Sequence, residues 1–195
     1  PNTKTAPVFR SRADADMTAK VYARVPVLID ESRRDGNPWS VSFMRMFDMS
    51  NDSGLFRTAA QLAEAGLVRD GSDWVAAGML SRRGTPAQMG FPRREPERYV
   101  PLYEGKMIHH YDHRYGDAAG LTVKPENAPL PRPSVEQLSN QEFEISTWYY
   151  VSANEVLKRS TGAGRGWLLG WRDITHRAVE RTVVACAFPK TAAGN

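Results

Sequence analysis

The chain contains a single cysteine among its 195 residues, so it cannot form an internal disulfide. A lone thiol fits a reducing compartment, and we therefore expect a cytoplasmic protein. Cys186 lies in the apolar run 182–188, where we expect a small buried side chain and not a reactive thiolate. No stretch approaches the roughly 20 apolar residues that a transmembrane helix requires, so we expect no membrane partner.

Features of targeting signals and of common catalytic sites are also missing. The first residues have no apolar segment behind a basic one, as a secretory signal would, and the chain begins with Pro1, which we interpret as an excised fragment. There is no Gly-x-Ser-x-Gly motif, and the glycine-rich residues 162–166 lack the trailing Lys-Ser/Thr of a phosphate-binding loop. The polar turn 48–54 lacks the spacing and the closing Glu of a calcium loop. We expect no catalytic, cofactor-binding or metal-binding residue in this chain.

Apolar residues and positive charge are both present. Hydrophobic residues make up 41% of the sequence, which is enough to bury a core, and the formal net charge is +4. The excess of basic residues is concentrated in two stretches, 82–114 and 158–181. This distribution permits binding to nucleic acid without requiring it.

Three segments begin with a Ser or Thr that is followed three residues later by an acidic or amide side chain, which is the pattern of a capping box. The pairs are Ser11 with Asp14, Thr58 with Gln61, and Ser152 with Glu155. They predict helices over residues 12–24, 58–66 and 154–159. The first helix should carry an apolar stripe of Met17, Val21 and Val25 and should end at Pro26.

Strands are predicted where β-branched and aromatic residues alternate with polar ones. These segments are 39–47, 74–80, 99–104, 146–152, 167–174 and 182–188. The last two are joined by a short connection and should form an antiparallel pair. In the first strand of this pair Leu169 and Trp171 share a face, which we expect to pack on the core, while Leu168 and Arg172 take the other face.

These elements predict a mixed α+β fold with largely antiparallel strands, several short helices, and long basic and Pro-rich loops. Residues 1–120 are expected to form an N-terminal α/β part that includes a basic loop at 81–98. The Pro-rich segment 121–134 reads as an extended connector, and any internal boundary falls there. Residues 135–195 then form a separate β segment.

Basic and hydroxyl side chains cluster around the connection between the last two predicted strands. The candidates are Arg172, Thr175, Arg177, Arg181 and Thr182. Guanidinium groups and hydroxyls suit contacts with phosphates and with guanine edges. The alternative is that Arg172 or Arg181 pairs with Asp173 or Glu180 and braces the turn.

A second cluster contains His109, His110 and His113 with Asp112 among them. Imidazole and carboxylate groups are good ligands for zinc or iron, but His110 stands where a zinc protease has its glutamate. The cluster is therefore open to three interpretations: a metal site, a polar surface that contacts phosphates or bases, or structural histidines.

Four blocks of the sequence resemble, in the same order, blocks of a known family. They are residues 1–30, 37–58, 99–114 and 167–189. They resemble large bacterial adenine-specific DNA methylases of restriction-modification systems, Type IIG-like enzymes with relatives in phage defence, which fuse a methylase to its own recognition region. In that family the blocks follow the catalytic domain.

The resemblance implies that residues 135–195 are the start of the target-recognition β segment. It also implies that this chain has no catalytic activity of its own. The family's Asn-Pro-Pro-Tyr/Phe motif is missing, since Asn37-Pro38 is followed by Trp39, and so is the glycine-rich loop for S-adenosylmethionine. This cofactor is expected in the catalytic domain of the parent methyltransferase. The implied partners are double-stranded DNA and that catalytic domain in the same polypeptide.

The resemblance also implies which residues contact DNA. Arg172, Thr175, Arg181 and Thr182 match the last block, and Lys106, His109, His113 and Arg114 match the middle block. Two alternatives remain open. The chain is either a structural connector of the same methylase that touches no DNA, or a metal-dependent hydrolase built on the His109–His113 cluster.

Overall fold

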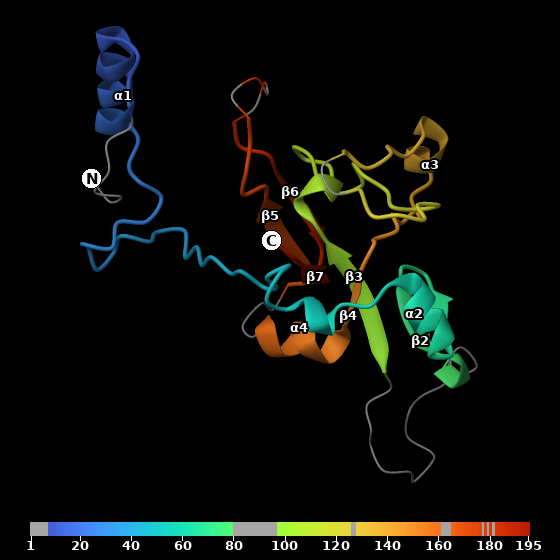
Figure 1. Cartoon of the computed structure of the whole chain (residues 1–195). Coiled ribbons are helices and arrows are strands. Elements are labelled where there is room, and N and C mark those ends of the chain that lie inside the picture. The colour runs from blue at the N-terminus through green and yellow to red at the C-terminus, as the bar shows by residue number, and fades with distance from the viewer. Residues whose placement is uncertain are drawn as a thin grey trace. The chain divides into compact units, whose positions relative to one another are not determined.

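A computed structural model describes residues 8–79, 97–125, 128–160, 165–176, 178, 180 and 182–195. The predicted basic loop therefore lies outside the described residues, except for its last two positions, and so do Arg177 and Arg181. The chain divides into two compact units, Pro1–Met44 and Arg45–Asn195. Helices and largely antiparallel strands are mixed along the chain (Figure 1), so the predicted α+β class is confirmed. Within the described part, no helix has the length and apolar character needed to cross a bilayer.

The first unit contains the predicted helix α1 (Arg12–Arg24). Its N-terminus is capped as predicted, because the Ser11 side chain accepts a hydrogen bond from the Asp14 backbone amide. No residue of α1 is buried, and the stripe residues Met17 and Val21 are exposed. The ends of the helix are therefore determined by its N-cap and by Pro26, and not by packing of its side chains.

The predicted strand at 39–47 is wrong. Trp39 and Phe43 are 77% and 60% exposed, and Ser40 has a φ of 49°, outside the extended region. Only Phe47 makes a strand-like contact, an isolated bridge to Gly194. Alternation of apolar residues describes one face of a strand, but a strand also needs a neighbour for its backbone groups.

The second unit is built on a five-stranded sheet in the order β1-β2-β3-β4, with β7 pairing β3. The strands are β1 (Leu67–Asp70), β2 (Asp73–Ala76), β3 (Arg98–Tyr103), β4 (Tyr150–Ser152) and β7 (Ala192–Ala193). All pairs are antiparallel except β3 with β7. The predicted strand at 74–80 ends at Ala76, because a 3-10 turn, Ala77–Met79, follows.

The second unit also has three short helices. Helices α2 (Ala59–Glu64) and α4 (Ala153–Arg159) contact the sheet, and α3 (Val135–Ser139) follows the Pro-rich segment. 3-10 turns lie at Ser53–Leu55 and Gly105–Met107. The predicted Thr58–Gln61 capping box is confirmed. The predicted cap at Ser152 is wrong, because its side chain makes no capping hydrogen bond and Glu155 instead binds Lys158 and Arg159. Helix α3 was not predicted from the sequence, although it has its own capping box of Ser134 and Gln137.

The Pro-rich segment packs into the second unit. Leu130 is buried in the same apolar cluster as Tyr103, Ile145 and Phe188, and the Pro131 carbonyl accepts a hydrogen bond from the Asp117 amide. The division into two compact units falls after Met44.

The predicted antiparallel pair near the C-terminus is confirmed as β5 (Trp167–Trp171) and β6 (Ala185–Pro189). Its expected orientation is wrong. Leu168 packs against the core, whereas Trp167, Leu169 and Trp171 are 45%, 65% and 47% exposed. Gly170 lies on the side of β5 that faces the core, because the Phe188 ring of β6 fills the space that a side chain would need there.

We expect Gly170→Ala to lower the free energy of unfolding by about 1–3 kcal/mol, the usual cost of overpacking. A Cβ at this position would lie 2.5 Å from the Phe188 ring. Gly166→Ala is the matched control, because nothing lies within 4 Å of its added Cβ. Denaturant unfolding of both variants gives the comparison, and equal stabilities would contradict this packing.

Candidate functional site

A tight turn, His109–Asp112, lies in the segment after β3 and is hydrogen-bonded to strand β6. The His109 and Asp112 amides each donate to the other residue's carbonyl, and the Tyr111 amide donates to the Ala185 carbonyl. Tyr111 has a φ of 63° and is 85% exposed. A left-handed backbone is uncommon for a non-glycine residue, and here it accompanies a tyrosine that points into solvent.

Four side chains, one of them from this turn, gather around the Tyr115 ring. We call this group the Tyr115 cluster: His109, Tyr115, Arg132 and Arg172. The His109 ring stacks on the Tyr115 ring with centroids 4.5 Å apart. The guanidinium carbons of Arg132 and Arg172 lie 4.3 Å and 5.5 Å from the same centroid. Three segments distant in sequence thus bring two permanent cations and one imidazole together.

In the described part of the chain, the two arginines of the Tyr115 cluster form no ion pair with a carboxylate, and Asp112 is the carboxylate that acts on His109. Arg132 donates to the Tyr115 hydroxyl, and Arg172 donates to backbone carbonyls, so their hydrogen-bond partners in the described structure are neutral oxygens. Desolvation, followed by the charges of Arg172 and Arg132, holds the pKa of His109 below its ordinary value. The arrangement therefore suits an anionic ligand.

Arg172 does brace the structure, but not by the ion pair considered from the sequence. Its Nε donates to the Gly105 and Ile108 carbonyls at 2.9 and 3.0 Å, and its Nη2 donates to the Ile108 carbonyl at 2.6 Å. Nearby, the Thr175 hydroxyl donates to the Thr182 carbonyl at 2.8 Å. Arg172 and Thr175, both predicted to contact DNA, thus form hydrogen bonds that stabilise the fold of their own chain.

The predicted contacts of the middle block are also engaged internally. The Lys106 amine donates to the Pro125 carbonyl at 2.8 Å and lies 3.9 Å from the Glu104 carboxylate. Arg114 donates to three carbonyls around the end of α3, those of Leu138, Asn140 and Phe143. Burial lowers the pKa of His113, so its imidazole favours the neutral form.

The histidines do not converge. His109 stacks on Tyr115, whereas the His110 ring lies 3.9 Å from the Tyr111 ring, centroid to centroid. Within the described ranges, no three His, Cys, Asp or Glu side chains are arranged to hold a metal ion. The metal interpretation of this cluster therefore gains no geometric support.

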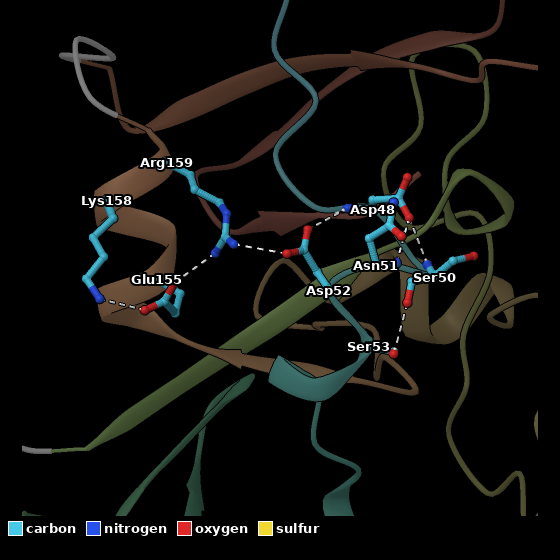
Figure 2. A network of polar contacts seen from close by, with 8 residues as sticks. All are labelled: Asp48, Ser50, Asn51, Asp52, Ser53, Glu155, Lys158 and Arg159. Carbon is cyan, nitrogen blue, oxygen red and sulfur yellow. Dashed lines mark hydrogen bonds and ion pairs between the residues drawn. The ribbon is translucent and has the colours of Figure 1, made fainter.

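The polar loop 48–53 is a brace for α4. Asp48 accepts from the amides of Ser50 and Asn51, and Asp52 accepts from the Asp48 amide. Figure 2 shows Arg159 between Asp52 and Glu155, with hydrogen bonds of 3.1 and 2.8 Å. The carboxylates of Asp48 and Asp52 are thus engaged by the chain itself.

Cys186 is buried in the core, as expected, and burial raises the pKa of its thiol to about 11. A thiol with this pKa is almost wholly protonated at neutral pH.

Arg132 and Tyr115 were not among the residues predicted from the sequence. Arg132 lies between prolines in the segment interpreted as a connector, and no local pattern indicated that it meets a tyrosine 17 positions away. Comparisons with family models, curated proteins and solved structures found no match to this chain.

Arg172→Lys should lower the free energy of unfolding by about 1–2 kcal/mol, because an ammonium cannot reproduce the guanidinium contacts and partly buried carbonyls lose their donor. Arg165→Lys is the control, since Arg165 is exposed and its described contact is with the Trp167 ring. Chemical denaturation measures both, and an Arg172→Lys variant as stable as the control would remove the bracing role.

Proposed function

We propose that this chain is a non-catalytic, DNA-contacting segment of the target-recognition region of a restriction-modification adenine DNA methyltransferase. The family named in this proposal is inferred from the four ordered sequence blocks. The observation that carries the DNA contact is the Tyr115 cluster, where Arg132 and Arg172 lie at one ring beside His109 and neither arginine pairs with a carboxylate in the described structure. Such a group matches a backbone phosphate, the part of DNA that dominates affinity.

The β5–β6 ribbon supports the same proposal. A two-stranded antiparallel ribbon fits the major groove of duplex DNA. Its connection begins at Arg172, and Ile174, Thr175 and His176 within it are exposed. The phosphate contact and the exposed connection therefore lie next to one another along the chain.

In this proposal the parent enzyme acts in the cytoplasm, and its S-adenosylmethionine is bound by the catalytic domain. The residues described here lack the motifs for that cofactor, so no chemical step is assigned to them. Methylation of an adenine requires the base to leave the duplex. This segment would hold the flanking DNA during that step.

A structural connector of the same methylase is the second candidate. It is favoured by the internal hydrogen bonds of Arg172, Thr175, Lys106 and Arg114. These side chains support the fold whether or not DNA is bound. Duplex binding separates the two candidates.

Duplex DNA should bind at low ionic strength with an affinity that falls steeply as salt rises. Arg132→Gln should weaken binding about fivefold for every duplex sequence and reduce the salt slope by about one, as expected for a phosphate contact of about 1 kcal/mol. Lys158→Gln removes the same charge from a residue paired with Glu155 and serves as the control. Titrations of a labelled duplex provide both quantities. Absence of binding at low salt would support the connector.

Duplex affinity should also increase as the pH falls below neutral. Because the pKa of His109 is below its ordinary 6.5, the ring is neutral at neutral pH and becomes a third cation only in acid. Phosphate favours the charged form, so adding duplex should raise the pKa of His109, which NMR titration measures directly. Asp112 and His110 also face this group, with opposite effects on its pKa.

His109→Gln should remove this pH dependence, whereas His113→Gln should retain it. A His109 pKa that does not move when duplex is added would place the phosphate elsewhere.

A further inference from the structure

The turn His109–Asp112 has a tyrosine at a position that turns usually give to glycine. The amides of His109 and Asp112 each donate to the other residue's carbonyl, so the turn is closed and Tyr111 is its third residue. The φ of Tyr111, 63°, lies in the left-handed region, where Gly or Asn is the usual third residue of a turn because a Cβ is strained there. A glycine would therefore suit the turn better, and the tyrosine needs a reason outside it.

The Tyr111 side chain is anchored at its base and open at its ring. Its backbone amide donates to the Ala185 carbonyl of β6 at 2.9 Å. The His110 ring lies beside the Tyr111 ring, with centroids 3.9 Å apart and an interplanar angle of 45°. Tyr111 is nevertheless 85% exposed, so most of its surface can meet a ligand.

The same turn supplies His109 to the Tyr115 cluster. His109 and Tyr111 are two residues apart, so their Cα atoms lie within about 7 Å of one another. A phosphate bound at the cluster would therefore have Tyr111 as a close neighbour. The acid of the turn is engaged, because the partly buried Asp112 carboxylate accepts a hydrogen bond from the Arg114 amide at 2.8 Å.

We propose that Tyr111 is a wedge that enters the base stack of a DNA duplex beside the phosphate held at the Tyr115 cluster, an inference that rests on the proposed function. A side chain inserted in this way partly unstacks one base step. An aromatic ring suits this insertion, because every base presents a face that can stack on it. Insertion costs least where the bases are already poorly paired, as at a mismatch.

The test compares a fully paired short duplex with one that has a single central mismatch, using the whole chain at low ionic strength. The parent chain should bind the mismatched duplex about tenfold more tightly, because less stacking is lost there when the ring enters. Tyr111→Gly should bind the two duplexes equally, since it removes the ring and glycine fits the left-handed backbone. Tyr111→Phe keeps the ring and should keep the preference.

Two further variants serve as controls. Tyr22→Ala removes a tyrosine of α1 that is 64% exposed, and it should bind both duplexes as the parent chain does. Arg132→Gln should weaken binding to both duplexes by the same factor, because it removes a phosphate contact and leaves the wedge in place. Circular dichroism of Tyr111→Gly should match that of the parent chain.

Equal binding of the two duplexes by the parent chain would overturn this inference and leave the phosphate contact standing. A preference that survives in Tyr111→Gly, or that Tyr22→Ala also loses, would overturn it as well. If the preference survives and Tyr111→Gly abolishes self-association of the chain, the exposed ring belongs to a protein interface. Failure of both duplexes to bind at low salt would overturn the proposed function, and the wedge with it.

Discussion

Strand β3 organises the second unit, because backbone hydrogen bonding along it joins segments that are distant in sequence. Its first residues pair with β2, its last residues with the C-terminal β7, and β4 lies along its other edge. Leu102 and Tyr103 are both buried and enter two different apolar clusters. A strand of six residues therefore fixes the packing on both faces of the sheet and places the turn that follows it against β6.

The arginines of this unit divide into those that serve the fold and those that remain available. Arg114 and Arg172 donate to backbone carbonyls, and Arg159 joins two carboxylates and covers the Phe47 ring. Arg132 differs, because it is exposed and its described partners are a hydroxyl and an aromatic ring. All of these side chains contribute to the positive net charge, but Arg132 can contact a ligand without releasing a backbone carbonyl.

Local features were predictable from the sequence, and features set by tertiary contacts were not. The caps of α1 and α2 follow from side chains three residues apart, so Ser11 and Thr58 predicted them correctly. The orientation of β5 depends on Phe188 filling the space at Gly170, which no alternation pattern within β5 records. For the same reason Arg172 was recognised as important but its carbonyl partners were not, since Gly105 and Ile108 lie more than 60 residues away.

The glycine beneath Phe188 also fixes the register of the ribbon. A slip of one residue between β5 and β6 would exchange their inner and outer faces and bring a leucine or a tryptophan under the ring. Only one alignment places the residue without a side chain where the ring needs space. The lack of a side chain at Gly170, on the buried side of β5, thus favours the arrangement in which the indoles of this strand meet solvent.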